Sequence, residues 1–247
     1  MNEKLDIVVT MGGLGSRFRD AGYTVPKYMI EVRGKTLFEW SMDSLEGYRD
    51  AAAKYIFIVM RDETADVERF MHSQCEALQL PEYHVIYLDY LTDGQATTAA
   101  LAKEFWDPSH GLLIYNIDTY VEPGNMTSQE LRGDGFIPCF KGEGDHWSFV
   151  RLDESGKAAE IREKVRVSEN CTLGAYYFRS CCLYQELYDE YYGKDYDVAV
   201  SGEKYVAPLY DYLLSKGGEI YISDVDPEKV HVLGTPEELK QFADGHH

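Results

Sequence analysis

Residues 6–17 read DIVVTMGGLGSR, and this stretch decides the fold. Its first six residues form a largely apolar run that is typical of a buried β-strand. Glycines follow directly at positions 12, 13 and 15. Glycine lets the backbone adopt positive φ angles and approach a ligand closely, and exposed backbone N–H groups in such a turn bind anions. The stretch predicts a strand that ends on a phosphate-binding loop, with Arg17 able to add a bidentate contact; a plain tight turn would also use these glycines.

The loop differs from two common phosphate-binding motifs. It lacks the Gly-x-Gly-x-x-Gly spacing of dinucleotide-binding folds, and no Gly-Lys-Ser/Thr ends it as in a P-loop. A second cation follows at Lys27, directly after Pro26. Because proline fixes the backbone in front of the lysine, we expect this side chain to be held rigidly near the loop.

Apolar runs alternate with helix-like stretches through the first half of the chain. Strands are expected at residues 6–11, 55–60, 84–88 and 111–117, and helices at residues 37–45, 64–78 and 97–104. Strands separated by helices imply parallel pairing in an α/β sheet.

The second half has a different pattern. Four strands with short connections are expected at residues 135–141, 147–153, 158–163 and 172–179, which suggests antiparallel additions to the sheet. The remaining elements are helices at residues 182–191, 205–214 and 236–242 and a strand at residues 219–222.

Composition narrows the class of partner. The 247 residues carry a formal net charge of −19, which repels nucleic acid and anionic membranes, so we expect neither as a partner. No apolar run is long enough to span a membrane. The five cysteines show no metal spacing, and their odd number without an export signal predicts reduced thiols and a cytoplasmic location.

Two more segments stand where ligands of open α/β sheets gather, at the carboxyl ends of strands. Asp118 follows the fourth predicted strand, and a carboxylate there suits Mg²⁺, which takes few carboxylates together with phosphate oxygens. Residues 92–100 (TDGQATTAA) connect a strand to a helix. Gln95 or Thr97 could cap that helix or contact a ligand.

In their order along the chain, these segments resemble the nucleotidylyltransferases that make nucleotide-activated sugars and related compounds. The N-terminal pattern of that family is Gly-Gly-x-Gly-Ser/Thr-Arg, then Pro-Lys, then Val/Ile-x-Gly-Lys, and residues 12–17, 26–27 and 32–35 supply all three. The resemblance to this sugar-phosphate nucleotidylyltransferase superfamily implies a Rossmann-like mixed sheet of the nucleotide-diphospho-sugar transferase type. We expect a single domain over residues 1–247, with a nucleotide-binding half (1–120) and an acceptor-binding half (121–244). Residues 245–247 (GHH) are a possible tag remnant.

The resemblance also implies roles for residues in the first half. Arg17 and Lys27 would balance charge as pyrophosphate leaves, and Asp118 would bind Mg²⁺, the expected cofactor. The implied nucleotide-binding residues are Met11, Gly12, Gly13, Gly15, Ser16, Gly94, Gln95 and Thr98.

The implied acceptor-binding residues lie in the second half. Residues 161–165 (IREKV) resemble the family segment Ile-x-Glu-Lys-Pro, with Val165 in place of proline, and point to Glu163 and Lys164. Residues 170–178 resemble the family strand Asn-x-Gly-x-Tyr-x-Phe, in which Gly174 would let the acceptor approach. Glu203 opens a segment that resembles the start of a family helix near the acceptor.

One position departs from the family pattern. Many relatives carry Trp-x-Asp-x-Gly-Thr near the C-terminus, where the aspartate is a second metal ligand, but Val232 occupies its position here. Either His231, Asp224 or Asp226 compensates, or Mg²⁺ is bound differently, or catalysis is impaired.

The resulting hypothesis is transfer of a nucleotidyl group from a nucleoside triphosphate to a phosphorylated small molecule, with release of pyrophosphate. A sugar 1-phosphate is the default acceptor, a non-sugar phosphate is an alternative, and the nucleobase stays open. Two other classes remain: a glycosyltransferase of the same fold, for which residues 116–118 form a partial Asp-x-Asp motif, and a non-catalytic nucleotide-binding protein, which Val232 keeps open. Relatives often pair, so a homo-oligomer is possible.

Overall fold

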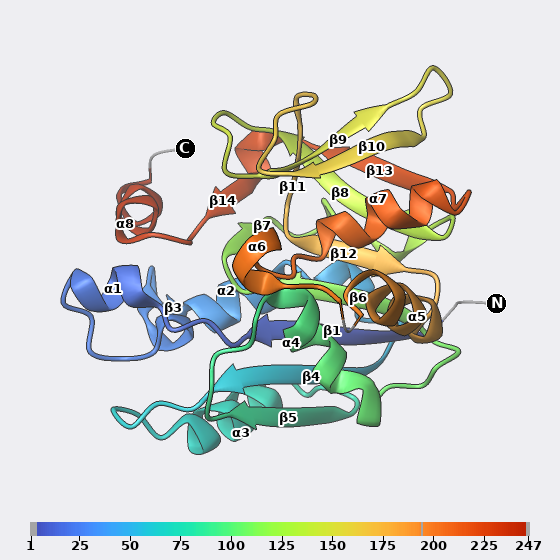
Figure 1. Cartoon of the computed structure of the whole chain (residues 1–247). Coiled ribbons are helices and arrows are strands. Elements are labelled where there is room, and N and C mark those ends of the chain that lie inside the picture. The colour runs from blue at the N-terminus through green and yellow to red at the C-terminus, as the bar shows by residue number, and fades with distance from the viewer. Residues whose placement is uncertain (1–3, 194, 246–247) are drawn as a thin grey trace.

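A large mixed sheet forms the centre of the molecule in the computed structural model, which describes residues 4–193 and 195–245 (Figure 1). The ten strands of this sheet run in the order β10-β9-β11-β8-β12-β6-β1-β4-β5, and β13 pairs with β8. Two small sheets, β14-β7 and β2-β3, stand beside it. The strands are β1 (Leu5–Met11), β2 (Glu31–Val32), β3 (Lys35–Thr36), β4 (Ala52–Met60), β5 (Tyr83–Leu88), β6 (Gly111–Asn116), β7 (Thr119–Val121), β8 (Gly135–Lys141), β9 (Ser148–Leu152), β10 (Ala158–Glu163), β11 (Asn170–Thr172), β12 (Ala175–Phe178), β13 (Ile220–Val225) and β14 (Val230–Val232).

Helices cover both faces of the sheet (Figure 1). The α-helices are α1 (Ser16–Asp20), α2 (Leu37–Asp43), α3 (Val67–Ala77), α4 (Gln95–Ala100), α5 (Cys181–Tyr191), α6 (Val198–Ser201), α7 (Ala207–Ser215) and α8 (Pro236–Asp244). Short 3₁₀ helices lie at Lys27–Met29, Glu46–Tyr48, Leu101–Glu104, Ser128–Glu130 and Pro227–Lys229.

The first strand shows why this half of the sheet is parallel and buried. β1 lies between β4 and β6 and pairs with both in parallel, and all of its residues are buried. Ile7 and Val9 pack in the cluster that includes α2 and α3, whereas Val8 packs in the cluster that includes α4, α5 and α7. A strand covered on both faces needs apolar side chains on both, which explains the apolar run.

The buried Asp6 near the start of β1 is the acidic exception to this apolar run, and both of its carboxylate oxygens have partners. Its Oδ2 accepts a hydrogen bond from the Asp107 amide at 2.6 Å, and its Oδ1 lies 2.9 Å from His110 Nδ1. Buried carboxylates are tolerated when they are paired in this way. The pair ties β1 to the loop before β6.

The second half adds antiparallel strands to the same sheet, as expected from the sequence. β12 pairs antiparallel with β6, and β8, β9, β10 and β11 continue outward with antiparallel neighbours. The α/β class and the mixed sheet are therefore confirmed. The junction of β6 and β12 is where the parallel part meets the antiparallel part.

Several predicted boundaries are wrong for local reasons. The strand predicted at residues 172–179 is two strands, because the backbone turns at Gly174 (φ 76°). The helix predicted at residues 64–78 begins at Val67, because Asp66 caps it by accepting from the Arg69 amide. The helix predicted at residues 97–104 begins at Gln95 and tightens to a 3₁₀ helix at Leu101. The short α1, α6 and β7 carry no periodic pattern and were missed.

The end of the chain is only partly described. Gly245, the first residue of the predicted tag remnant, is the C-cap of α8 in the left-handed conformation. Residues 246–247, the rest of that predicted remnant, lie outside the described residues. Within residues 4–193 and 195–245, none of the helices has the length and apolar character needed to cross a membrane.

Candidate active site

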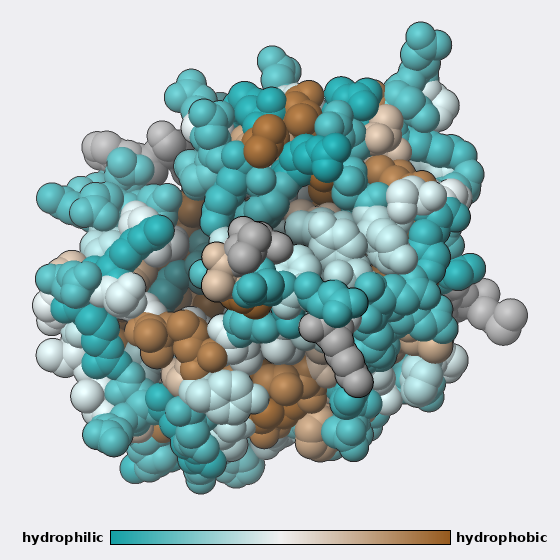
Figure 2. Space-filling model, viewed as in Figure 1, coloured by the Kyte–Doolittle hydropathy of each residue, from teal (hydrophilic) through white to brown (hydrophobic). Residues whose placement is uncertain are grey.

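A cavity of about 630 Å³ opens at the carboxyl ends of β1 and β6. In the space-filling view the surface of this face is hollowed left of centre (Figure 2). Every site residue predicted from the sequence lines the cavity: Met11, Gly12, Gly13, Gly15, Ser16, Arg17, Lys27, Gly94, Gln95, Thr98, Asp118, Glu163, Lys164, Gly174 and Glu203. The fold thus gathers residues from both halves around one space; their individual roles stay predictions.

The glycine loop leaves one arginine unpaired. Arg17 is exposed at the start of α1 and, within the described parts of the chain, makes no ion pair with a carboxylate. Arg19, two residues later, is bound to Asp62 and faces away from the cavity lining. The Arg17 guanidinium therefore remains available for a phosphate oxygen.

Lys27 and Asp118 form an ion pair on the cavity wall. Lys27 Nζ lies 2.5 Å from Asp118 Oδ1, and only 12% of the lysine side chain is exposed against 48% of the aspartate side chain. The Phe18 ring lies 5.5 Å from the ammonium group. Pro26 (φ −52°) precedes the lysine and starts its 3₁₀ turn, as the Pro-Lys pair predicted. The lysine is held in place, while the carboxylate remains open to the cavity.

The side chains at the start of α4 hold this segment in place and do not cap the helix. Gly94 is the N-cap and no side chain caps the helix, so neither Gln95 nor Thr97 has the capping role. Gln95 Nε2 donates to Thr10 Oγ1 at 3.2 Å, and Thr98 Oγ1 donates to the Gly94 carbonyl at 3.0 Å. These bonds fix the α4 segment against the end of β1.

Lys204, from the second half of the chain, contacts the segment at the start of α4. Its backbone carbonyl accepts from the Ala96 amide at 2.9 Å, and its amide donates to the Asp93 carbonyl at 2.9 Å. A Cβ on Gly94 would lie 2.4 Å from the Lys204 carbonyl oxygen, so only glycine allows this approach. Lys204 Nζ also pairs with Asp93 Oδ2 at 2.9 Å. The two halves of the cavity wall are therefore joined directly.

Three groups with altered pKa values form the far wall. Burial raises the pKa of Glu163, and a hydrogen bond from Ser148 and the charge of Lys164 only partly offset this effect. Lys164 Nζ donates to the Tyr205 hydroxyl at 2.6 Å; burial opposes its charge, but that bond and the nearby carboxylates raise its pKa. Desolvation likewise raises the pKa of Tyr205.

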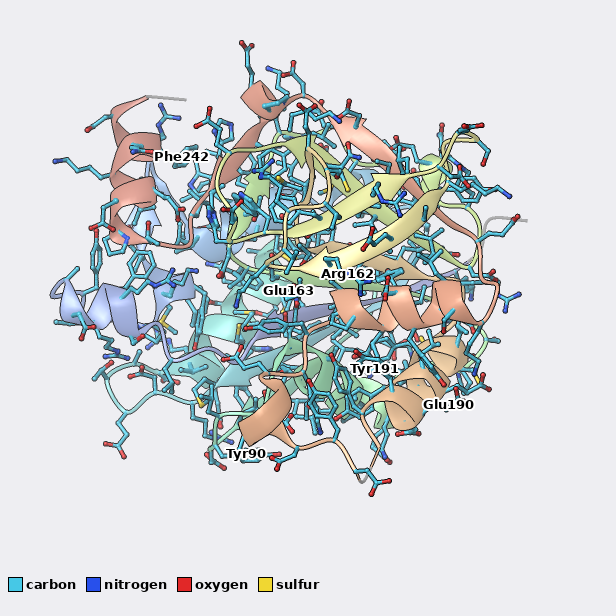
Figure 3. The ribbon with its side chains drawn as sticks, turned by 45° about the horizontal axis from the view of Figure 1, so that its top comes forward. Tyr90, Arg162, Glu163, Glu190, Tyr191 and Phe242 are labelled. Carbon is cyan, nitrogen blue, oxygen red and sulfur yellow. The ribbon has the colours of Figure 1, made fainter. Side chains whose placement is uncertain are left out.

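Neighbouring side chains on β10 face different parts of the molecule (Figure 3). Glu163 lies toward the middle, whereas Arg162 lies beside α7 and pairs with Asp211 at 3.0 Å. This alternation follows from the strand geometry. It explains why Glu163 lines the cavity and Arg162 does not.

Two features require glycine at position 174: the left-handed turn of its backbone and the close approach of the Asn116 side chain. A Cβ at Gly174 would lie 2.2 Å from Asn116 Oδ1, and that oxygen is buried without a hydrogen-bond partner in the structure. The backbone N–H of Asn116 donates to the Gly174 carbonyl at 3.1 Å. Asn116, Trp147 and Tyr205 also line the cavity; the sequence does not predict them there, because their position depends on contacts between distant segments.

The substitutes considered for the missing aspartate do not lie in the cavity. His231 is buried and stacks on Tyr120 with ring centroids 5.3 Å apart, and Asp226 accepts from the Glu228 amide at 3.0 Å to start a 3₁₀ turn. Neither they nor Asp224 line the cavity, whereas Val232 does. Val232 pairs with Thr119, and the Leu233 amide donates to the Asp118 carbonyl at 2.7 Å. The position next to Asp118 is thus apolar.

The chain shares substantial sequence identity with a solved structure. The chain is 33% identical to the nucleoside-diphosphate-sugar pyrophosphorylase from Vibrio cholerae RC9, with a TM-score of 0.87 over 96% of this chain and 99% of that chain. No family model and no curated protein matches the present chain.

Two further solved structures share the fold at low identity. The inositol-1-phosphate CTP transferase from T. maritima is 14% identical, with a TM-score of 0.75 over 99% of this chain and 98% of that chain. The CTP:phosphocholine cytidylyltransferase from Streptococcus pneumoniae is 13% identical, with a TM-score of 0.69 over 98% of each chain. The mixed sheet is therefore of the nucleotide-diphospho-sugar transferase type. Since the Vibrio cholerae relative matches over nearly the full length of both chains at 33% identity, the chain belongs to the nucleotidylyltransferase family that includes the nucleoside-diphosphate-sugar pyrophosphorylases.

Proposed function

We propose that the protein transfers a nucleoside monophosphate group from a nucleoside triphosphate to a phosphorylated small molecule and releases pyrophosphate. The observation that carries this proposal is that the glycine loop, Lys27 and Asp118 line the same cavity as Glu163 and Lys164. A sugar 1-phosphate is the first acceptor to test, since the relative at 33% identity is named for a nucleoside-diphosphate sugar.

The chemical step needs no side-chain nucleophile. A phosphate oxygen of the acceptor forms a bond to the α-phosphorus, and the bond from that phosphorus to the bridging oxygen breaks as pyrophosphate leaves. The loop amides and Arg17 are placed to bind the phosphates, and Lys27 is placed to offset negative charge that develops between them. Positioning and electrostatics of this kind account for most catalysis of phosphate transfer.

Asp118 fits the expected magnesium ion. Its half-exposed carboxylate lies on the cavity wall beside Lys27, and Mg²⁺ is commonly held by one or two carboxylates together with substrate phosphates. A bound magnesium ion would neutralise phosphate charge and orient the phosphate chain. Lys27 Nζ contacts the Oδ1 atom of Asp118, which leaves the second carboxylate oxygen for a metal ion.

The far wall is suited to the acceptor. Glu163 can accept hydrogen bonds from hydroxyl groups, and Lys164 supplies a positive charge for a phosphate. Lys164 is 52% exposed and reaches over the Tyr205 ring at 4.4 Å. Glu203 stands exposed beside it on the same cavity.

Pyrophosphate release tests the proposal. The protein with Mg²⁺ is assayed with ATP, CTP, GTP and UTP against a panel of sugar 1-phosphates and non-sugar phosphates. We expect release with one pair, which names the base and the acceptor together. Transfer of a sugar without pyrophosphate would assign a glycosyltransferase instead, and triphosphate binding without turnover on any acceptor would assign a non-catalytic protein.

A further inference from the structure

The chain contains three Thr-x-x-Glu segments at the starts of helices, and two of them behave alike. In the first, the Glu39 carboxylate accepts from the backbone amide of Thr36 at 2.8 Å. In the second, the Glu130 carboxylate accepts from the Thr127 amide at 3.2 Å. Both are closed capping boxes, in which the threonine caps the helix and the glutamate folds back onto the cap.

The third segment, at the start of α8, stays open. Thr235 Oγ1 caps the helix by accepting from the Glu238 amide at 3.2 Å, as Thr36 Oγ1 accepts from the Glu39 amide at 3.2 Å in the first segment. The Glu238 carboxylate does not return to the cap, and its Oε2 atom is buried without a hydrogen-bond partner in the structure. A buried carboxylate oxygen without a partner is costly. The same four-residue pattern thus has another use here.

The free oxygen of Glu238 faces Asp118. Both residues line the cavity, and Gly234 lies between them. The point where a Cβ on Gly234 would stand is 3.3 Å from Glu238 Oε2 and 3.9 Å from Asp118 Oδ2. The absence of a side chain at Gly234 therefore leaves the two carboxylates facing each other across one small space.

We infer that Glu238 supplies the second carboxylate for the divalent cation that Asp118 binds, in place of the acidic side chain that Val232 lacks. Within the described residues no three acidic, histidine or cysteine side chains converge as a preformed metal site. Two carboxylates completed by substrate phosphates are a usual environment for Mg²⁺. The inference rests on the proposed function, since the triphosphate must provide the remaining oxygens.

Binding of Mn²⁺ tests this assignment without relying on turnover. Mn²⁺ is titrated into the protein alone and with each of the four nucleoside triphosphates, and water-proton relaxation reports the protein-bound metal. Glu238→Gln keeps the shape of the side chain and removes its charge, and Glu237→Gln is the matched control at the exposed neighbouring position. We expect E238Q to weaken Mn²⁺ binding in the triphosphate complex about 10-fold or more, and E237Q to bind like the parent protein.

A second variant separates a lost ligand from a damaged helix. Val232→Asp is added to E238Q, because Val232 lines the same cavity beside Asp118. Recovery of Mn²⁺ affinity in the double variant supports the inference, whatever the melting temperature of E238Q. Equal affinities of E238Q and E237Q, or no recovery in the double variant, would overturn it. Failure of the proposed function is recognised separately, because the unmodified protein would then release no pyrophosphate with any pair of substrates. If the unmodified protein also fails to bind Mn²⁺ with every triphosphate, the inference fails as well.

Discussion

The two walls of the cavity are built in different ways. The wall from the first half offers backbone groups of the glycine loop and a lysine side chain that is only 12% exposed. The wall from the second half offers side chains at the end of β10 and the side chains of Glu203 and Tyr205, and Lys164 there is 52% exposed. The binding groups of the first wall are placed mainly by the path of the main chain. Those of the second wall depend on the identity of its side chains.

This difference indicates how one fold can serve several acceptors. Triphosphate groups are common to all the candidate nucleotides, so a wall made largely of backbone can bind them without depending on the acceptor. Side chains such as Glu163 and Lys164 can change without moving a strand. We therefore expect changes on the first wall to affect chemistry most and changes on the second wall to affect acceptor binding.

Lys27→Ala should have the largest effect on turnover. It removes the ammonium group that pairs with Asp118 at 2.5 Å. Loss of one group that stabilises developing charge costs about 10²–10³-fold in kcat. Steady-state pyrophosphate release measures the change, with Lys103→Ala as control because Lys103 is exposed and lies outside the cavity lining. A rate for K27A within a few-fold of the K103A rate would remove Lys27 from the chemistry.

Gly174→Ala should lower the stability of the protein at the junction between the two walls. An added Cβ would stand 2.2 Å from Asn116 Oδ1, and φ is 76°. We expect a loss of about 3 kcal/mol in the free energy of unfolding, from the clash and the left-handed backbone together. Gly156→Ala is the matched control, because its φ is 83° and nothing lies within 4 Å of the new Cβ. Urea unfolding compares them, and equal midpoints would show that Asn116 yields at no cost.

The fold was predictable where its causes are local. The apolar run of β1, the glycines after it and the Pro-Lys pair act through neighbours in the chain, and the structure places all of them as expected. Lys204 was missed, because its contacts to Asp93 and the Gly94–Ala96 backbone join segments about a hundred residues apart. Glu238 was missed because its Thr-x-x-Glu pattern predicts a closed cap, and only the fold reveals the open one.

Lys204→Met tests the link between the two walls. The side chain pairs with Asp93 at 2.9 Å and lies within 6 Å of three tyrosine rings. Burial would raise the pKa of Asp93, but its hydrogen bonds with Thr97 and Lys204 outweigh that effect and lower it. Removal of the cation should cost about 1 kcal/mol of stability and raise KM for both substrates, with kcat less affected.

Lys216→Met is the control for that link. Lys216 also pairs with a carboxylate, that of Glu190, and also lies over a tyrosine ring, that of Tyr212, but neither partner lines the cavity. Its loss should leave both KM values unchanged. If K204M changes only stability, the Lys204 side chain is a structural brace that does not affect substrate binding.

The smallest expected effect is a pH-dependent gain of stability in Glu163→Gln. Burial raises the pKa of Glu163 in the folded protein above its value in the unfolded chain. The contribution of this group to stability is therefore full below the unfolded pKa and is lost as pH rises through the folded pKa. Glutamine does not titrate, so E163Q should melt about 1–2 °C higher than the parent at neutral pH, and the gain should disappear near pH 4. Acceptor KM should rise in the same variant.

Glu160→Gln, on the same strand, should show the opposite sign. Hydrogen bonds from Arg151 and Arg162 lower the pKa of Glu160, so its contribution is present above the unfolded pKa and is lost as pH falls. E160Q should therefore melt lower than the parent at neutral pH and approach it in acid, with acceptor KM unchanged. Melting curves from pH 4 to 8 make the comparison. Parallel pH profiles for E163Q and the parent would mean that the Glu163 carboxylate is solvated and that burial does not raise its pKa.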